Sequence, residues 1–352
     1  MMADVLVGDA GGTSLRFALA RRTGGAIVLD AQRKYSEVKD AHGRVGRPLF
    51  KSFDDGLAAY IEETGIDPAG RAALFAVAGP PDVDGGVEMT NRTYWPRILP
   101  GALTARFGLR QVNLVNDFAG LARSVPDLPN SDFVEILPGA GRPGAPIVVT
   151  GPGTGFGIAT LMTTSTGRFV PITGQGGHAG YAAQTVREAE LAARLPACEK
   201  ARDIFAAHGL PPGTTYVATE MIVSGEWLKP VFDILSDMHN VERRDLSAQE
   251  ILDAAEAGDP VCVETCLLRA RGIMGAAGDV VLINGGQGGV VLTGGVAERM
   301  PGWLKHPEAT ARFLQRGSET PYMADVPVRV LMNPDAPLLG AAALLFDRLS
   351  EA

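Results

Sequence analysis

GDAGGTSLRF, residues 8–17, places an acid, two glycines and a hydroxyl between two apolar segments. The segment before it, DVLVG, is typical of a buried strand that ends at Asp9, and SLRFALA alternates as a half-buried strand does. A plain hairpin turn is one interpretation of the glycines between them. The other is an anion site, because Gly11 and Gly12 free the backbone to point N–H groups outward and Thr13 adds a hydroxyl. In that second interpretation, Asp9 could hold a Mg²⁺ ion, directly or through water.

A similar arrangement occurs in residues 146–162, PIVVTGPGTGFGIATLM, where an apolar strand, a turn rich in Gly and Thr, and a second strand follow one another. The similarity between residues 4–20 and 146–162 indicates a duplicated architecture. Two such turns, one in each half, could grip a triphosphate from both sides. The second turn contains Gly151, Gly153, Thr154, Gly155 and Gly157.

A third glycine turn, Gly294–Gly295, follows the predicted strand GVVLT. Two small residues at this point permit the close approach of a flat ring. An ordinary connection between a strand and a helix would have the same composition.

The remaining pattern mixes short apolar segments with longer helical periodicities, which implies layered α/β domains. Further strands are predicted at residues 26–35, 72–79, 111–117, 289–293 and 326–333. Helices are predicted at residues 53–64, 99–108, 118–125, 185–195, 219–238, 247–258, 261–283 and 337–349, and an exposed loop at residues 138–146. A capping box, Ser247 to Glu250, marks the start of one of these helices.

Composition restricts the class of protein. The chain has 352 residues and a net charge of −8, which argues against a nucleic-acid or anionic-membrane surface. Three cysteines cannot make a disulfide framework, and small core residues in a reducing compartment are the simpler interpretation. The start MMADVLVGD has no basic segment and no long apolar run, and nothing in the chain approaches the length of a membrane span. A cytoplasmic protein is expected, and the sequence leaves open whether it forms a homodimer.

Asn116 and Asp117 follow the predicted strand VNLV. In open α/β sheets, ligands bind outside the carboxyl ends of strands. A carboxylate placed there can accept a hydroxyl proton during attack on phosphorus. The competing interpretation is structural, because Asp before FAGLARS is a good helix N-cap.

The segment GQGGH, residues 174–178, places the amide of Gln175 and the imidazole of His178 on a glycine-rich loop. Both groups can donate and accept hydrogen bonds with hydroxyls, although a surface loop with a stray histidine would look the same. Glu220 lies in the first turn of a predicted helix, where an acid also suits the helix dipole.

Taken in order, these segments resemble the bacterial glucokinase family of the sugar-kinase, Hsp70 and actin superfamily. GDAGGTSLRFA and VTGPGTGFG resemble its two phosphate segments, and LVNDFAGLA resembles the segment with the catalytic aspartate. GQGGHAGYA and ATEMIVSG resemble its sugar-binding segments. VVLTGGVAER resembles the adenosine segment, and NPDAPLLGAA the closing helix, so that the resemblance extends over nearly the whole chain.

The resemblance implies a two-domain actin-like ATPase (ribonuclease H-like) α/β fold with a duplicated hairpin-containing core. A small domain would comprise residues 1–116 plus 334–352, and a large domain residues 117–333, with the sugar between them. It also implies ATP-dependent phosphorylation of the 6-hydroxyl of glucose, a step of glycolysis. The implied base is Asp117, and the implied magnesium ligand is Asp9. The implied sugar contacts are Asn116, Asp117, Gln175, His178 and Glu220, and the implied ATP contacts are Asp9, Gly11, Gly12, Thr13, Gly151, Gly153, Thr154, Gly155, Gly294 and Gly295.

The loop GQGGH departs from the family pattern, which usually reads GEGGH, at Gln175. A carboxylate bond to a hydroxyl contributes ~1.5–3 kcal/mol, against ~0.5–1.5 kcal/mol for a neutral amide. A loss of ~1 kcal/mol is roughly a fivefold weakening of binding. The sequence therefore leaves three sugar interpretations open: glucose bound weakly, another hexose, or an amino sugar.

Two other functions fit the same fold. A non-catalytic sugar or nucleotide sensor would close on its ligand without phosphoryl transfer, and the intact Asn116–Asp117 pair weighs against it. An actin-like or chaperone-like ATPase would hydrolyse ATP without sugar, and the loop at residues 174–178 together with Glu220 favours a polyol acceptor instead. The absence of a zinc-binding cysteine cluster and of an N-terminal helix-turn-helix weighs against a related DNA-binding regulator.

Overall fold

The computed structural model describes residues 4–37 and 48–350 of the chain. Its internal contacts divide the chain into two compact units. The first unit contains Met1–Asp132, Ala159–Thr173 and Asn333–Ala352, and the second contains Phe133–Ile158 and Gly174–Met332. The functional domain boundaries given above, residues 1–116 plus 334–352 and residues 117–333, stay a prediction.

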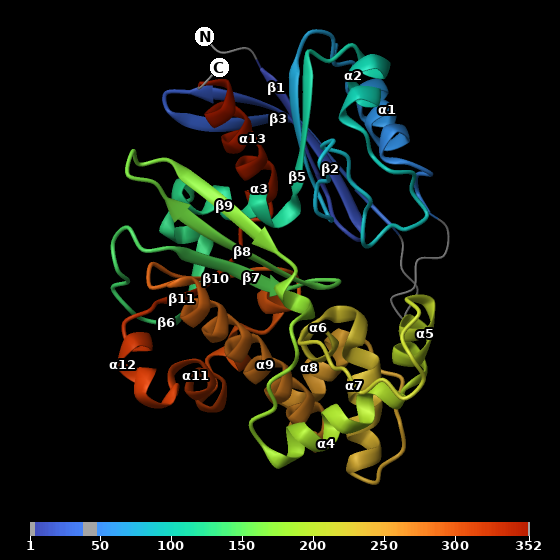
Figure 1. Cartoon of the computed structure of the whole chain (residues 1–352), viewed down its shortest axis with the longest axis vertical. Coiled ribbons are helices and arrows are strands. Elements are labelled where there is room, and N and C mark those ends of the chain that lie inside the picture. The colour runs from blue at the N-terminus through green and yellow to red at the C-terminus, as the bar shows by residue number, and fades with distance from the viewer. Residues whose placement is uncertain (1–3, 38–47, 351–352) are drawn as a thin grey trace. The chain divides into compact units, whose positions relative to one another are not determined.

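The first sheet has five strands in the order β3-β2-β1-β4-β5 (Figure 1). Strands β1 and β2 form the predicted antiparallel hairpin, in which Asp9 lies opposite Arg16. Strands β1, β4 and β5 are parallel, and Asp9, Ala76 and Val115 share one register position. The carboxyl ends of these three strands therefore meet at the same edge of the sheet. The strand bounds are β1 Val5–Ala10, β2 Ser14–Thr23, β3 Ala26–Ser36, β4 Ala72–Val77 and β5 Gln111–Asn116.

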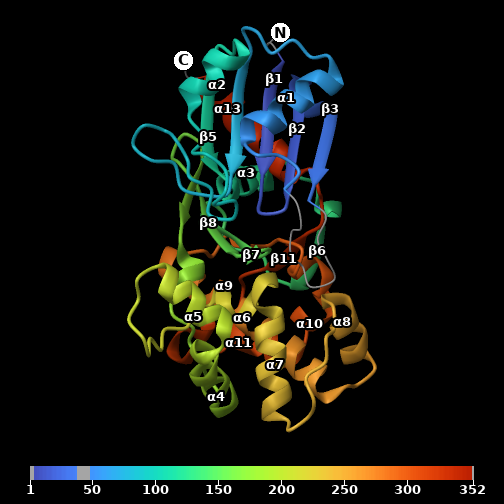
Figure 2. The same ribbon diagram turned by 90° about the vertical axis from the view of Figure 1, so that its right-hand side faces the viewer.

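Helices cover both faces of this sheet, with α1 and α2 on one face and α3 and α13 on the other (Figure 1 and Figure 2). The helix bounds are α1 Phe53–Thr64, α2 Pro100–Phe107, α3 Asp117–Ser124 and α13 Ala336–Leu349. Aromatic rings fill the α1 face, where Phe17 packs edge-on against both Phe53 and Phe75. On the other face, a Cβ at Gly340 would lie 1.7 Å from the carbonyl oxygen of Gly120, so α3 and α13 pack with their backbones in close approach.

The second sheet has six strands in the order β6-β11-β10-β7-β8-β9. Strand β10 is parallel to both β7 and β11, and β6 is antiparallel to β11. The strands β7 and β8 flank the second predicted glycine turn, as β1 and β2 flank the first. The bounds are β6 Phe133–Leu137, β7 Ile147–Pro152, β8 Phe156–Thr163, β9 Phe169–Gly174, β10 Gly289–Leu292 and β11 Val328–Leu331. Strands β6 and β9 are absent from the sequence prediction.

Several helices of the second unit pack around the long helix α9, Pro260–Asn284 (Figure 1). Asp259 caps α9 by accepting hydrogen bonds from the backbone N–H groups of Val261 and Cys262, and Gly285 ends it with a φ of 68°. The other helices are α4 Val186–Arg194, α5 Glu199–Ala207, α6 Glu220–Val223, α7 Leu228–Met238, α8 Ala248–Glu256, α10 Pro301–Leu304, α11 Pro307–Leu314 and α12 Thr320–Met323. Among the residues that the structure describes, no helix is both long and apolar enough to cross a bilayer.

Two helix predictions of the second unit have different outcomes. The capping box is confirmed, because the Ser247 hydroxyl and the Glu250 carboxylate each accept from the other's backbone N–H. The single helix predicted at residues 219–238 is wrong, because α6 ends before Ser224 and α7 begins only at Leu228. The break has a tertiary cause: the N–H of Gly225 donates to the carbonyl oxygen of Gly153 instead of continuing the helix.

Candidate functional site

The first glycine turn, residues 11–13, is fixed by hydrogen bonds at both of its ends. The Gly11 N–H donates to the carbonyl oxygen of Ser14, at 3.0 Å, and so closes the turn. The carbonyl oxygen of Thr13 accepts from the N–H of Glu37, at 3.0 Å. The carbonyl oxygen of Gly11 accepts from Nε of Arg92, at 3.1 Å. With these carbonyls bound on the protein side, the turn has the fixed backbone that an anion site requires.

Arg92 was not predicted from the sequence as a site residue. It is only 2% exposed, and its guanidinium is 2.5 Å from the Glu37 carboxylate. The guanidinium also lies over the ring of Trp95, 4.4 Å from its centre, and the Tyr94 hydroxyl donates to the same Glu37 oxygen. This buried ion pair therefore anchors both ends of the first turn. Arg92 binds the carbonyl oxygen of Gly11, and the backbone of Glu37 binds that of Thr13.

Asp9 lies one residue before the end of β1 and is buried. Burial raises the pKa of its carboxyl to about 7; the Arg16 guanidinium, 3.9 Å away, opposes that rise, and the nearby Asp117 carboxylate adds to it. A buried carboxyl whose ionisation is opposed by a second acid at the same sheet edge is a suitable environment for a divalent cation.

Asn116 and Asp117 lie at the carboxyl end of β5, at the same sheet edge as Asp9. The N-cap of α3 is Asn116, whose Oδ1 accepts from the N–H of Phe118 at 3.0 Å. Asp117 is the first residue inside the helix, so the alternative in which Asp117 is the helix cap is wrong. Its Oδ1 also accepts from the Phe118 N–H, at 3.0 Å. Although the side chain keeps some exposure, desolvation by the surrounding atoms raises the pKa of Asp117 to about 6, against the hydrogen bond from Phe118.

The second glycine turn, residues 153–155, is fixed by a different set of groups. The Gly153 N–H donates to the carbonyl oxygen of Gly155, and the Gly153 carbonyl accepts from the N–H of Gly225, both at 2.9 Å. The Glu220 carboxylate accepts from the N–H of Phe156 at 2.8 Å. A Cβ at Gly155 would lie 2.6 Å from that carboxylate, so glycine is what allows Glu220 to approach the turn.

The loop of residues 174–178 lies against the second turn and the segment before Glu220. A Cβ at Gly177 would lie 2.1 Å from the carbonyl oxygen of Phe156, so the two backbones are in contact. The carbonyl oxygen of His178 accepts from the Tyr216 hydroxyl, and that of Ala179 accepts from the N–H of Thr219 at 2.9 Å. The Gln175 and His178 residues remain exposed. Within the second unit, the predicted loop, the second turn and Glu220 are therefore brought together.

The third glycine turn lies beside the second. A Cβ at Gly151 would lie 1.8 Å from the carbonyl oxygen of Thr293, and Gly294 has a φ of 89° that L side chains rarely adopt. The N–H of Val296 donates to the carbonyl oxygen of Pro152, at 3.2 Å. The parallel strands β7 and β10 thus end in two glycine segments in contact, as the predicted phosphate and adenosine segments require.

A cavity of about 70 Å³ opens beside Gly295 in the second unit. Its apolar walls come from four separate segments, and two arginines also line it. The lining includes Leu228, Ile251, Leu252, Val296, Arg269 and Arg299. None of these was predicted as a site residue. The helices α7, α8 and α9 meet here only in the tertiary structure, and in the sequence each shows only the apolar periodicity of an ordinary packed helix.

The fold, with its two strand–glycine turn–strand units and an acid at the carboxyl end of β5, has the arrangement expected of a sugar kinase of the actin-like ATPase class. A family model described as Glucokinase matches residues 6–348. A glucokinase from Chromohalobacter salexigens is 32% identical over 348 residues, covering 99% of this chain and 99% of that protein. One from Caulobacter sp. is 31% identical over 345 residues, covering 97% of this chain and 94% of its own length.

Solved structures agree with these relatives. The crystal structure of a glucokinase from an Antarctic psychrotroph superposes with a TM-score of 0.77 at 28% identity, covering 99% of this chain and 100% of that one. The chain belongs to the glucokinase family, and it is therefore a phosphotransferase.

Proposed function

We propose that the protein transfers the γ-phosphoryl group of Mg-ATP to the 6-hydroxyl of glucose, with Asp117 as the general base. The observation that carries this proposal is the state of Asp117: Asn116 takes the capping role, and burial raises the pKa of the Asp117 carboxyl to about 6. A carboxylate of that pKa is ionised at neutral pH and still basic enough to accept the hydroxyl proton as the bond to phosphorus forms. Family membership supports the same reaction.

The sugar hydroxyls are assigned to four further side chains. We propose that Asn116, Gln175, His178 and Glu220 hydrogen-bond them. Support comes from the contacts of Glu220 and the 174–178 loop with the second turn, because these contacts hold this acid and this loop next to the proposed phosphate segment. A sugar held by several such bonds presents one hydroxyl to the base and leaves no room for water.

The triphosphate is assigned to the two glycine turns, through Gly11, Gly12, Thr13, Gly151, Gly153, Thr154 and Gly155. We propose that Asp9 serves Mg²⁺, directly or through water. The donor set suits this ion, since Mg²⁺ in kinases is held by one or two carboxylates together with the phosphates. The cation supplies neutralisation of the phosphate charge when bound.

The nucleoside is assigned to the cavity beside Gly294 and Gly295. Its apolar side chains, among them Leu228, Ile251 and Val296, offer an apolar surface for a flat base. Because Val296 also donates its N–H to Pro152 of β7, this cavity and the second turn share one backbone segment.

The test is release of ADP from Mg-ATP in the presence of glucose. Asp117→Asn should lower kcat by roughly 10²–10⁴-fold, the usual contribution of a general base, while calorimetry shows that glucose still binds. Asp127→Asn is a control at an exposed acid that follows helix α3 and pairs with Arg123 at 2.7 Å, and it should keep wild-type turnover. Wild-type kcat in Asp117→Asn would exclude Asp117 as the base.

A second candidate is a kinase of another hexose or of an amino sugar, and the residue that favours it is Gln175. If this position binds glucose, Gln175→Glu should lower the KM for glucose by roughly fivefold, since a charged acceptor replaces a neutral one. An unchanged KM would remove Gln175 from the sugar site. A panel of glucose, glucosamine, mannose, fructose and N-acetyl sugars identifies the preferred acceptor. The cytoplasmic location and the homodimer stay predictions.

A further inference from the structure

The segment of residues 220–225 contacts the second glycine turn at both of its ends. At its start, the Glu220 carboxylate accepts from the N–H of Phe156, at 2.8 Å. At its end, the Gly225 N–H donates to the carbonyl oxygen of Gly153, at 2.9 Å. Any shift of this segment therefore moves a sugar-binding carboxylate and a phosphate turn together.

Arg269 of α9 holds the middle of this segment. Its guanidinium donates to the carbonyl oxygens of Val223, at 2.8 Å, and Ser224, at 3.0 Å. Both of these residues are fully buried, so no solvent would replace the guanidinium if it were removed. Arg269 is thus a second hydrogen-bond donor, besides the N–H of Gly225, that fixes the break between α6 and the turn leading into α7.

The charge of Arg269 is unusual for a buried group. The residue is 7% exposed, and none of the acids among residues 4–37 and 48–350 forms an ion pair with it. Its Nε has no hydrogen-bond partner within the same residues, and burial lowers the pKa of the guanidinium to about 10. A buried donor without a partner is costly, which suggests a function beyond packing.

The same side chain lines the cavity beside Gly295. One side chain therefore both lines the space assigned to the nucleoside and, through its guanidinium, holds the segment that carries Glu220. A second arginine, Arg299, also lines the cavity, whereas lining residues such as Leu252 and Met300 contribute no charge.

We propose that Arg269 is a positioning residue that couples occupancy of the nucleoside cavity to the position of Glu220, and hence to the affinity for sugar. This inference rests on the proposed function. Nucleotide bound in the cavity holds the guanidinium, and with it residues 223–225, in the arrangement that Glu220 needs to meet a sugar hydroxyl. The free-energy cost of ordering residues 223–225 is then smaller for glucose when nucleotide is already bound, and smaller for nucleotide when glucose is bound. The coupling between the two ligands is therefore positive and reciprocal.

The experiment measures the Kd of glucose by calorimetry, with and without saturating Mg-ADP, a pair that cannot react. In the wild type, Mg-ADP should tighten glucose binding at least about fivefold, within the usual range of such couplings. Arg269→Met should bind glucose with the same Kd in both conditions. A merely structural role would weaken glucose binding equally with and without Mg-ADP and leave the ratio of the two Kd values unchanged.

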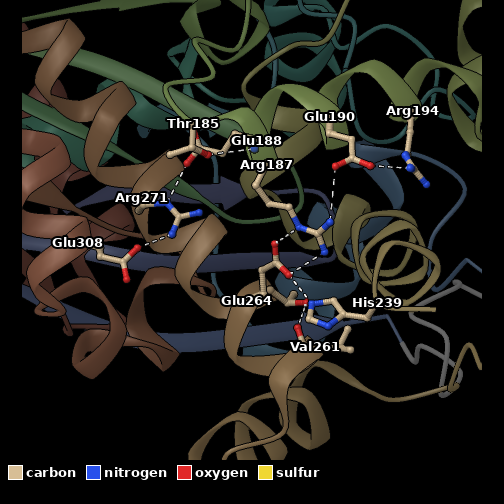
Figure 3. Close-up of polar contacts among 11 residues, drawn as sticks. Thr185, Arg187, Glu188, Glu190, Arg194, His239, Val261, Glu264, Arg271 and Glu308 are labelled. Atoms are coloured by element: carbon tan, nitrogen blue, oxygen red, sulfur yellow. Dashed lines mark hydrogen bonds and ion pairs between the residues drawn. The ribbon is translucent and has the colours of Figure 1, made fainter. Parts of the chain in front are cut away.

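Arg271→Met is the matched control on the same helix. Figure 3 shows the Arg271 guanidinium directed at Glu188 and Glu308, and it pairs with them at 2.8 and 2.7 Å. Because Arg271 does not line the cavity, this variant should keep the wild-type ratio even if it melts earlier. Arg269→Lys, which keeps the charge but has a single nitrogen, serves if the methionine variant does not fold, and it should lower the ratio.

Three results would overturn the inference, each read from the ratio of the glucose Kd without Mg-ADP to that with Mg-ADP. The first is a ratio near one in the wild type, and the second is a wild-type ratio in the Arg269 variants. The third is a ratio in Arg271→Met that falls as much as in the Arg269 variants. Failure of the proposed function is recognised separately. If the wild type released no ADP with glucose, the proposed function would be wrong. If the wild type turned over normally while Arg269→Met kept the coupling between Mg-ADP and glucose binding, only the inference about Arg269 would be wrong.

Discussion

The two glycine turns have the same local construction but are held by different kinds of groups. The first turn is anchored by the buried pair Arg92–Glu37, and neither residue is expected to touch a ligand. The second is anchored by Glu220, which we assign to the sugar, and by the N–H of Gly225. The duplicated device therefore has an independent anchor in one half, whereas in the other the anchor is shared with substrate binding.

This difference indicates which substitutions should affect phosphate binding without affecting sugar binding, and which should affect both. Loss of the Arg92–Glu37 pair should disturb phosphate binding and stability but leave sugar contacts alone. Loss of Glu220 should disturb the phosphate turn and the sugar together. The predictions below test that contrast, beginning with the largest expected effect.

Arg92→Met removes one partner of a buried ion pair and leaves the Glu37 carboxylate without its cationic partner. Breaking such a pair costs about 3–5 kcal/mol of unfolding free energy, which urea denaturation can measure. In the folded fraction, the KM for ATP should rise and the KM for glucose should stay within twofold of wild type. A rise in the KM for glucose equal to that for ATP would show that the first turn is not independent of the sugar site.

Glu220→Ala removes the acceptor of the Phe156 N–H and a proposed sugar contact in one change. Each bond to the carboxylate contributes ~1.5–3 kcal/mol, so kcat/KM for glucose should fall roughly 10–100-fold. Steady-state kinetics should also show a higher KM for ATP, in contrast to the selective effect of Arg92→Met. An unchanged KM for ATP would mean that Glu220 does not support the second turn.

The acids beside the first turn should give the protein a defined pH dependence. Because the pKa of Asp117 is raised to about 6, kcat/KM should fall about tenfold per pH unit below that value as the base is protonated. The free energy of unfolding should change with pH in the opposite direction to kcat/KM. The raised pKa of Asp9, about 7, means that the folded state binds its proton more tightly than the unfolded state, so stability falls as pH rises from about 4 to about 7.

Substitution of Asp9 tests this linkage. Without ligands, Asp9→Asn should raise the Tm at pH 8, where the wild type has a buried charge, and should have little effect near pH 4. Thermal melts at both pH values make the comparison. A lower Tm at pH 8 would show that the ionised carboxylate is stabilised in the folded protein.

Two glycines of the second turn offer the finest comparison. A Cβ at Gly155 would lie 2.6 Å from the Glu220 carboxylate, whereas nothing lies within 4 Å of a Cβ at Gly153. Gly155→Ala should therefore displace Glu220 and lower kcat/KM by roughly tenfold, about 1.4 kcal/mol. Gly153→Ala should leave the KM for glucose close to wild type, because it does not displace Glu220, and an equal effect of the two substitutions on this KM would contradict the assigned contact.

Much of the fold and of the candidate site could be predicted because the signals are local. Alternation and glycine turns located the hairpins around Asp9 and Gly153, and the strand before Asn116 located that pair at a sheet edge. Arg92 could not be predicted, since it lies 81 residues from Gly11 and looks like any surface arginine in the sequence. The helix break at Ser224 and the role of Arg269 were missed for the same reason: both depend on bonds to residues distant in the chain.

The packing of α13 has a consequence for the order of folding during synthesis. Leu338, Leu345 and Phe346 of this last helix share one buried cluster with Val5 and Val7 of the first strand. The apolar surface of β1 that faces them stays uncovered until Ala336–Leu349 has left the ribosome. By then residues 174–332 are complete, so we expect the emerging chain to bury its later half before its earlier one.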